Sequence, residues 1–595
     1  MTDPAHHLFK RDPKRLLVIL LLSIAIGSPV IAQTQDFVPV TAEMLVSPDA
    51  DDWLMLGRTY DEQRFSPLDQ INRENVGQLR LVWSRGFAAG AQSTIPIVYA
   101  GVLYVVSPID SVQALNATTG DLIWEYAREF IPGLRSALSA STSSKSLAIY
   151  QDLIFYTSAD GYLVALDVRD GSVRWQVESY AADSNGKNTS APIVVEGNVI
   201  TARACSEQAS CFIAAHDAMT GKEVWKFYAA AAEGDPGGDS WGNVPTEKRV
   251  ASLWGLPGSY DPKKRLIYWG TANPQPYTRL SRHGDPDGTS RTAPADLYSN
   301  STLALHAETG ELAWYYQHLP GDDWDADHTH ERILVRTSVN PDPDAVKWIN
   351  PNIPPGEERD VVVHIGEGGG MWLLDQNSGE FLWAMPFPVD DPAFNVADID
   401  VETGRTEINW DNVFKEDKQS VITCFHNTRG YWPMAYHPET NSIYVAFHDY
   451  CLGMTADLSS PTGYTDRLGR LRPGVDPDKA YALGKIDLTT GKLTRLHESG
   501  IPGNGAVLAT AGNLIFWGDM DRRMRAFDPE SGEILWESIL GGIIQMSTIT
   551  YAVDEKQYIA VMTGDGNSAT RNPATLANLT VPRGHNAIYV FALPR

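Results

Sequence analysis

Four aspartates lie within a stretch of nine residues, PGDDWDADH, which runs from Pro320 to His328. Asp325 and Asp327 are two residues apart, and on an extended segment side chains at this spacing point the same way. Two carboxylates that face one site repel each other, and a bound cation is the usual means of holding them together. The spacing therefore indicates a metal site, and a solvated acidic loop is the simpler alternative.

The composition limits the classes of protein to which the chain can belong. It has 595 residues and a formal net charge of −26, which argues against nucleic-acid binding because phosphate recognition needs a basic surface. The 17 tryptophans, 24 tyrosines and 49 glycines are typical of a turn-rich β protein. A chain of this length is too long to form one ordinary hydrophobic core unless repeated units close into a ring.

The first 32 residues have the pattern of an export signal. A basic region with Lys10 and Arg15 precedes an apolar run from Leu16 to Ile26, and small residues before Gln33 offer a cleavage site. The apolar run is shorter than the ~20 residues that span a bilayer. We expect residues 1–32 to be removed and residues 33–595 to form one periplasmic domain without a membrane span. An uncleaved anchor is the alternative.

A unit of two short β-branched runs and a turn recurs from Leu81 onward. Each copy ends in Ala-x-Asp-x-x-Thr-Gly-x-x-x-Trp or a variant, and its Asx-Gly pair predicts a turn between strands. A tryptophan at one fixed place per copy predicts a packing plug between neighbouring units. Seven copies and a closing strand at 587–594, paired with N-terminal strands, predict an all-β, eight-bladed β-propeller. The copies are Ala114–Trp124, Ala165–Trp175, Ala215–Trp225, Ala304–Trp314, Leu373–Trp383, Lys485–Arg495 and Ala526–Trp536.

The chain has four cysteines, which an exported protein is expected to pair. Cys205 and Cys211 are close in sequence, and Cys424 and Cys451 flank an expected hairpin. Four cysteines allow three disulfide connectivities. The one that joins cysteines near each other in sequence consists of these two pairs. The sequence contains no C-x-x-C-H segment, so we expect no covalently attached c-type haem.

Together these features give the chain a specific resemblance to a known family. The repeats, WGTANP (Trp269–Pro274), PGDDWDAD and GDMDRRMRAFD (Gly518–Asp528) resemble segments of the pyrroloquinoline quinone (PQQ)-dependent alcohol dehydrogenases, quinoproteins similar to methanol dehydrogenase large subunits. The resemblance covers essentially all of residues 50–595. It implies an enzyme that oxidises a small alcohol to an aldehyde or ketone and passes electrons to a separate soluble cytochrome c. The resemblance is also compatible with a homodimer.

The resemblance assigns a metal site to four residues. Asn273 matches a metal-ligating asparagine, Glu207 a ligating glutamate, and Asp325 the catalytic aspartate, which also ligates and takes the alcohol proton. Asp327 lies where calcium-type methanol dehydrogenases have a small residue and the lanthanide-dependent branch has an aspartate. The expected ion is a lanthanide. Calcium or magnesium is the alternative, because glucose dehydrogenases with Asp-x-Asp at this point use divalent ions.

The cofactor that the resemblance implies is PQQ, held by Thr189, Trp254, Lys145 and Ser206. Thr189 aligns with a hydroxyl that hydrogen-bonds PQQ, and Trp254 with an indole that stacks on the flat quinone. Lys145 replaces an arginine of the family, and as a point charge it could still hold a PQQ carboxylate.

Three further sites depart from the family pattern. Adjacent cysteines over the cofactor become Ser139 and Ala140, and a first-blade glutamate becomes Ser93. An arginine that contacts the quinone oxygens becomes Glu367, which reverses the charge. With the long insertions at 276–300 and 384–423, these changes lead us to expect a substrate other than methanol.

Two other classes of protein are alternatives. One is a non-catalytic propeller scaffold, and the other is a propeller hydrolase that uses the same carboxylates on a metal-bound water. His328 and His330 could suggest zinc, but the sequence offers no third ligand, so we expect both to be loop histidines.

Overall fold

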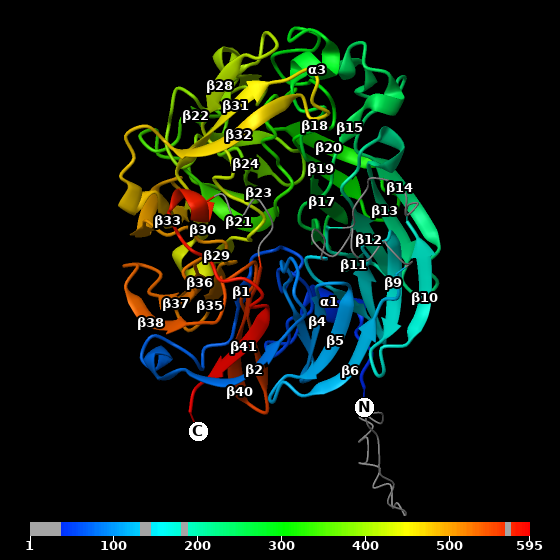
Figure 1. Ribbon diagram of the computed structural model, residues 1–595, viewed down its shortest axis with the longest axis vertical. Coiled ribbons are helices and arrows are strands. Elements are labelled where there is room, and N and C mark those ends of the chain that lie inside the picture. The colour runs from blue at the N-terminus through cyan, green and yellow to red at the C-terminus, as the bar shows by residue number, and fades with distance from the viewer. Residues whose placement is uncertain (1–36, 131–143, 180–188, 566–572, 595) are drawn as a thin grey trace, which may run out of the picture. The chain divides into compact units, whose positions relative to one another are not determined.

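The computed structural model of the protein describes residues 37–130, 144–179, 189–565 and 573–594 (Figure 1). Residues 1–32, Ser139 and Ala140 lie outside the described residues. The chain divides into a short unit, Met1–Phe37, and a large one, Val38–Arg595, which holds every element named below. Among the described residues, no helix has the length and apolar character needed to cross a bilayer.

Eight sheets of four or five strands follow one another along the described part of the chain. The first four are made of β3 (Ile97–Tyr99), β4 (Val102–Ser107), β5 (Ser111–Asn116) and β6 (Leu122–Ala127); β7 (Ala148–Tyr150), β8 (Leu153–Thr157), β9 (Tyr162–Asp167) and β10 (Val173–Glu178); β11 (Ile193–Val195), β12 (Asn198–Ala202), β13 (Phe212–Asp217) and β14 (Glu223–Tyr228); and β16 (Ser259–Asp261), β17 (Leu266–Gly270), β19 (Ser301–His306) and β20 (Leu312–Gln317).

The other four sheets complete the series. They are made of β21 (Ile333–Val339), β23 (Glu357–Ile365), β24 (Met371–Asp375), β25 (Phe381–Met385) and β22 (Trp348–Ile349); β29 (Ala435–His437), β30 (Ser442–His448), β33 (Tyr481–Asp487) and β34 (Leu493–Ser499); β35 (Leu508–Thr510), β36 (Leu514–Gly518), β37 (Arg523–Phe527), β38 (Ile534–Ile539) and β1 (Phe65–Ser66); and β39 (Ile549–Val553), β40 (Lys556–Thr563), β41 (Ala587–Ala592) and β2 (Arg80–Gly86).

Smaller elements lie in the insertions between these strands. They are the pairs β15 (Val250–Ala251) with β18 (Pro274–Gln275) and β26 (Val396–Ile399) with β27 (Thr406–Ile408); the sheet of β28 (Ser420–Thr423), β31 (Tyr450–Ala456) and β32 (Tyr464–Leu471); the helices α1 (Ala42–Val46) and α3 (Arg279–His283); and 3₁₀ turns at Val76–Gln78, Gln208–Ser210, Gly238–Trp241, Thr246–Lys248, Trp410–Asn412, Pro438–Thr440 and Pro477–Lys479.

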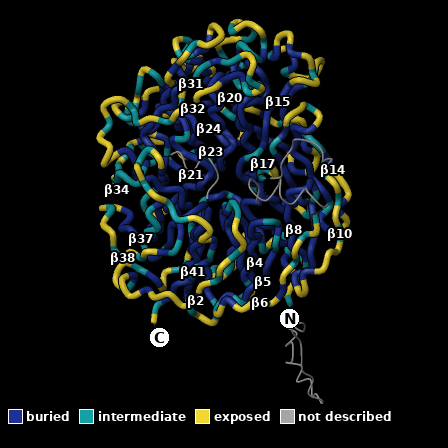
Figure 2. The backbone as a smooth tube through the Cα atoms, viewed as in Figure 1, coloured by how far each residue is buried: buried dark blue, intermediate teal, exposed yellow. Residues whose placement is uncertain are grey.

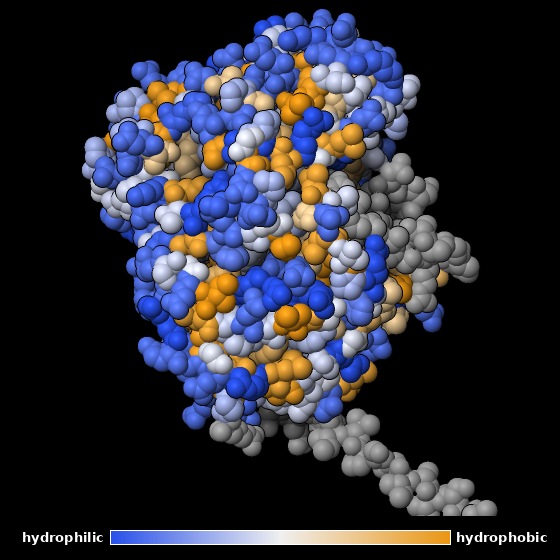
Figure 3. Space-filling view, turned by 60° about the vertical axis from the view of Figure 1, so that its left-hand side comes forward, coloured by the Kyte–Doolittle hydropathy of each residue, from blue (hydrophilic) through white to orange (hydrophobic). Residues whose placement is uncertain are grey.

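Burial changes across each sheet from one edge to the other. Strands inside a sheet, such as β8 and β36, are buried throughout, because both of their faces are covered by neighbouring sheets. The last strands, such as β10 and β38, consist mostly of exposed and half-buried residues, and Figure 2 shows this change from blue to yellow. On one face of the molecule, Figure 3 shows mostly hydrophilic residues, with hydrophobic ones in small groups.

The repeated tryptophans pack against the glycine turns of the next sheet. The Trp124 Nε1–H donates to the Val168 carbonyl oxygen at 2.8 Å. A Cβ on Gly171, whose φ is +72°, would lie 2.5 Å from Trp124 Cε3, so only glycine fits beneath the ring. The same arrangement recurs for Trp83 and Gly120, Trp175 and Gly221, Trp225 and Gly310, and Trp314 and Gly379.

The sixth repeat, in which Arg495 replaces tryptophan, packs differently. The glycine of the following turn, Gly532, meets the Leu496 backbone, whose carbonyl oxygen would lie 2.3 Å from an added Cβ. The chain approaches this turn with its backbone because no large ring is available between the two units.

The two ends of the large unit share one sheet. β2 pairs antiparallel with β41 over its whole length, with Trp83 opposite Val590. The pairing expected between residues 587–594 and an N-terminal strand is therefore confirmed. The disulfides Cys205–Cys211 and Cys424–Cys451 are the local pairs expected from the sequence.

Candidate active site

The aspartate-rich segment 320–328 is buried rather than solvated, and it connects β20 with β21. The expectation of an extended segment is wrong at Asp325, which has a φ of +63°. The two carboxylates nevertheless face one site, since Asp325 and Asp327 line the same cavity. The Asp322 carboxylate folds the segment on itself by accepting hydrogen bonds from the Trp324 and Ala326 amides at 2.7 and 2.8 Å.

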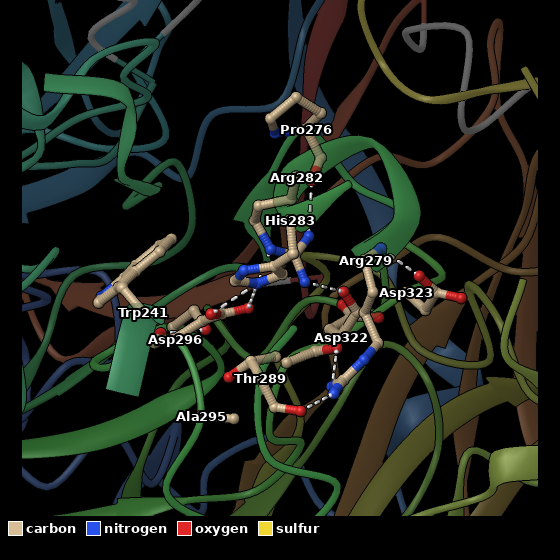
Figure 4. Close-up of polar contacts among 12 residues, drawn as sticks. Trp241, Pro276, Arg279, Arg282, His283, Thr289, Ala295, Asp296, Asp322 and Asp323 are labelled. Atoms are coloured by element: carbon tan, nitrogen blue, oxygen red, sulfur yellow. Dashed lines mark hydrogen bonds and ion pairs between the residues drawn. The ribbon is translucent and has the colours of Figure 1, made fainter. Parts of the chain in front are cut away.

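Arginines of the insertion at 276–300 contact Asp322 and Asp323 at the start of this segment (Figure 4). Arg282 Nη2 donates to the Asp322 carbonyl oxygen at 3.0 Å, and the Arg279 amide donates to the Asp323 carboxylate. Arg282 also forms an ion pair with Asp296 at 2.9 Å, and both side chains are fully buried. This insertion, which the sequence suggested as a determinant of the substrate, thus holds the aspartates in place.

Asn273 connects the two site aspartates inside a cavity of about 240 Å³. Its Nδ2 donates to Asp325 Oδ1 at 2.9 Å, and its backbone N–H donates to Asp327 Oδ1 at 2.8 Å. Asp327 Oδ2 accepts a further bond from Trp254 Nε1 at 2.6 Å. The described residues that line the cavity are Trp254, Asn273, Gln275, Tyr277, Asp325, Asp327, Glu367, Asn427, Gly430, Tyr431, Trp432, Arg467 and Pro573.

The hairpin of β31 and β32 supplies two more contacts to Asp325. Arg467 Nη1 lies 2.7 Å from Asp325 Oδ2, and the Tyr464 hydroxyl donates to the same oxygen at 3.2 Å. The disulfide Cys424–Cys451 ties β31 to the end of β28, which fixes the hairpin relative to the cavity. No local pattern in the sequence marks Tyr464 or Arg467, because they follow Asp325 by more than a hundred residues.

Burial and mutual repulsion control the protonation of the carboxyl groups in the cavity. Burial raises the pKa of Asp325 to about 6, although the Arg467 guanidinium acts in the opposite direction. The pKa values of Asp327 and Glu367 lie well above their usual range, because burial and then the neighbouring carboxylates disfavour the charged forms. A cation in the cavity would relieve this repulsion.

Three of the residues expected to hold a cofactor meet beside the aspartates. Lys145 Nζ donates to the carbonyl oxygens of Thr189 and Trp254, each at 2.8 Å, and Thr189 Oγ1 donates to the Trp254 carbonyl at 2.9 Å. Lys145 and Thr189 therefore fix the backbone that carries the indole. Tyr431 packs edge-on to Trp254, with ring centroids 6.1 Å apart.

Glu207 and Ser206 are not brought into the described wall of the cavity. Both are exposed in the loop closed by the Cys205–Cys211 disulfide, and neither belongs to the described lining of the cavity. Glu367, which the sequence marked only as a charge reversal, lies in the cavity wall and is 6% exposed.

His328 and His330 lie in the loop before β21, as the sequence predicts, but the expectation that no third ligand is available is wrong for His328. Both are buried, and His328 Nδ1 lies 2.9 Å from His364 Nε2. His318 completes a group in which one nitrogen from each of three rings lies within 4.8 Å of the others. This cluster could not be predicted from a local motif, because His318 and His364 come from strand ends outside the HTH segment.

Comparisons with known proteins agree with the fold. Residues 53–386 and 481–559 match the family described as the glucose/ethanol/alcohol dehydrogenase PQQ β-propeller domain. The chain is 30% identical to the quinohemoprotein alcohol dehydrogenase ADH-IIG of Pseudomonas putida, over 93% of this chain and 78% of that protein. It is 27% identical to the quinoprotein alcohol dehydrogenase PedH of Pseudomonas putida strain KT2440, over 94% and 93%.

Among solved structures, a europium-containing methanol dehydrogenase superposes with a TM-score of 0.78 at 25% identity, over 93% of this chain and all of that one. The match over more than half of the chain defines the class, a mostly-β protein of the PQQ β-propeller type. The chain belongs to the PQQ-dependent alcohol dehydrogenase family and is a quinoprotein alcohol dehydrogenase.

Proposed function

We propose that the protein is an exported, periplasmic dehydrogenase that oxidises an alcohol to an aldehyde or ketone at a metal–PQQ centre. Electrons would then pass to a separate soluble cytochrome c. The observation that carries the proposal is the cavity in which Asn273 joins Asp325 and Asp327 beside Trp254. Buried carboxylates that are held together in this way call for a positive partner.

The donor set of the cavity suits a hard cation. Asn273, Asp325 and Asp327 offer only oxygen ligands once the carboxyl groups are deprotonated. The amide oxygen of Asn273 accepts no hydrogen bond from the residues that the structure describes, so it remains available for coordination. The resemblance to the family adds Glu207 as a fourth ligand. The extra carboxylate of Asp327 favours a lanthanide over calcium, and the likeness to a europium-containing enzyme supports this choice.

The walls of the cavity suit a flat, anionic cofactor. Trp254 and Tyr431 offer aromatic surface, and Lys145 places a positive group 5.2 Å from the centre of the Trp254 ring. In this proposal Trp254 stacks on PQQ, while Thr189 and Lys145 fix the position of Trp254. Ser206 is a further contact that the resemblance implies.

When bound, PQQ would supply the hydride acceptor, and the cation held by Asn273, Asp325 and Asp327 would supply a Lewis acid. Asp325 accepts the proton of the substrate hydroxyl group. Tyr464 and Arg467 hold Asp325 Oδ2, and Asn273 holds Oδ1, so the base is fixed in one orientation. The segment that carries it is closed to solvent from behind by the arginines of the insertion 276–300.

The proposal extends to the architecture and export of the protein. The eight sheets are eight blades, and the five tryptophan–glycine contacts dock five of these blades onto the blade that follows. Residues 1–32 are a signal peptide, and residues 33–595 form the mature propeller, as a monomer or a homodimer. The basic and apolar composition of residues 1–32 supports their assignment as a signal peptide.

Dye-linked alcohol oxidation by the metal-free protein, supplied with PQQ and either La³⁺ or Ca²⁺, tests the function. We expect turnover with La³⁺ that is lost in Asp327→Ala. Asp325→Asn should lower kcat by about 10²- to 10⁴-fold, because the general base is removed. Asp285→Asn, the same change at an exposed position in the insertion, is the matched control and should leave kcat unchanged.

The other outcomes are equally informative. Turnover with Ca²⁺ alone would keep the reaction and replace the lanthanide by a divalent ion. A protein that binds no PQQ with either ion would contradict the dehydrogenase and favour a scaffold role. A substrate series in which methanol is by far the best would overturn the expectation of a different alcohol.

A further inference from the structure

Glu367 has a fixed place in the wall of the same cavity. It follows β23 in the segment GEGGG, and its side chain is 6% exposed. Its backbone N–H donates to the Asp327 carbonyl oxygen at 2.9 Å, and its own carbonyl accepts from the Thr428 amide at 3.1 Å. These two bonds set the position of Glu367 directly beside one of the site aspartates.

The Glu367 carboxylate lacks a protein partner. It makes no hydrogen bond or ion pair with any residue that the structure describes, although it lines the cavity with Asp325 and Asp327. Asp325, by contrast, is held by Asn273, Tyr464 and Arg467. A buried carboxylate without a partner is costly, since it has lost its water without gaining a counter-charge. Among the described residues none fills this role, and a cation in the cavity would supply the missing partner.

Glu207 occupies a different environment. It precedes the 3₁₀ turn Gln208–Ser210 within the short loop closed by Cys205 and Cys211. Its backbone carbonyl accepts bonds from the amide and the hydroxyl of Ser210, and the residue is exposed. An exposed glutamate in a closed disulfide loop needs no cation for its stability.

We propose that Glu367, in place of Glu207, is the fourth protein ligand of the cation in this chain. This inference rests on the proposed metal site and changes its composition. The site then has three carboxylates from Asp325, Asp327 and Glu367, with the neutral amide oxygen of Asn273. Arg467, which pairs with Asp325, offsets one of the three negative charges, and a trivalent ion with oxygen ligands more than balances the remaining two.

Terbium titration of the full-length, metal-free protein tests this assignment without cofactor or turnover. Trp254 Nε1 lies 2.6 Å from Asp327 Oδ2, so excitation of this indole should sensitise Tb³⁺ bound at the aspartates. We expect Glu367→Gln to raise the Kd for Tb³⁺ at least tenfold. Glu207→Gln, the same change at the exposed position, should alter it less than twofold.

A thermal measurement separates ligation from damage to the fold. Glu367→Gln removes a buried, unpartnered carboxylate at nearly constant volume, so the metal-free variant should unfold at the same or a higher Tm than the parent protein. The rise in Tm that Tb³⁺ produces should shrink, because ligand-induced stabilisation follows the affinity. A variant that unfolds early without metal would show a structural role for Glu367 and overturn the inference.

The outcomes distinguish this inference from the function on which it rests. A terbium signal that disappears in Asp327→Asn but persists in Glu367→Gln, or falls equally in Glu207→Gln, overturns the role of Glu367 and keeps the metal site. A parent protein in which no saturable signal depends on Asp327 overturns the metal site itself.

Discussion

Lys145 shows how strongly a single buried residue can depend on its surroundings. Its ammonium group lies beneath Trp254, where burial lowers the pKa from 10.5 to about 7. In the unfolded chain the amine keeps its ordinary pKa. Between about pH 7 and pH 10 the unfolded state therefore binds more protons than the folded state, and the free energy of unfolding rises with pH in this window.

Lys145→Met should remove this contribution. The urea midpoint of the parent protein should rise more between pH 7 and pH 9.5 than that of the variant, because methionine has no proton to lose. Lys222→Met, at an exposed position, is the control, and its urea midpoint should rise with pH as much as that of the parent protein. Equal slopes in all three proteins would mean that the two carbonyl oxygens at Lys145 keep it charged.

The residues that the sequence could predict are those carried by short motifs. Asn273 lies in TANP, and Asp325 and Asp327 lie in DWDAD, so their chemistry is visible within a few positions. Arg467 and Tyr464 were missed, because they reach Asp325 from a hairpin that only the folded chain brings near. Local spacing holds no information about such a contact.

At the scale of the elements, the repeats were predictable because each copy carries its own turn and its own tryptophan. The sheet of β28, β31 and β32 was not predicted as a separate unit, because its strands carry no copy of the repeat. The disulfide Cys424–Cys451 connects β31 of this sheet to the end of β28. The bracing role of α3 was also missed. It depends on buried arginine contacts that a polar insertion does not reveal in sequence.

The tryptophan–glycine contacts give a test at this scale. Gly171→Ala must accept both a left-handed backbone, at about 1–2 kcal/mol, and a Cβ 2.5 Å from Trp124, at about 1–3 kcal/mol more. Gly474→Ala, with a φ of +85° and no atom within 4 Å of the added Cβ, should lose only the free energy of the left-handed backbone. Denaturant midpoints should show the larger loss for Gly171→Ala. Equal losses would mean that the tryptophan moves freely and does not lock the turn.

For the whole molecule, closure of the last sheet should matter more than any single exposed strand. Val590 on β41 is fully buried opposite Trp83, whereas Val173 on β10 is 43% exposed. Val590→Asp should lower the free energy of unfolding by about 4 kcal/mol or more, because a charge is buried without a partner. Val173→Asp should change it by less than about 0.5 kcal/mol.

Circular dichroism and tryptophan fluorescence can follow both variants. If closure stabilises all sheets together, the two signals of Val590→Asp should move to lower denaturant in one shared transition. A separate early transition, seen by only one signal, would show that the last sheet opens on its own.

The pairing of β2 with β41 also sets a waiting time during synthesis. The strand Arg80–Gly86 is made early, but its partner Ala587–Ala592 leaves the ribosome some five hundred residues later. At about 5–20 residues per second, β2 stays an unpaired edge for roughly half a minute or more. Its Trp83 and neighbouring apolar residues are then open to any other strand, so a chaperone that shields nascent edges would have its longest task at this segment.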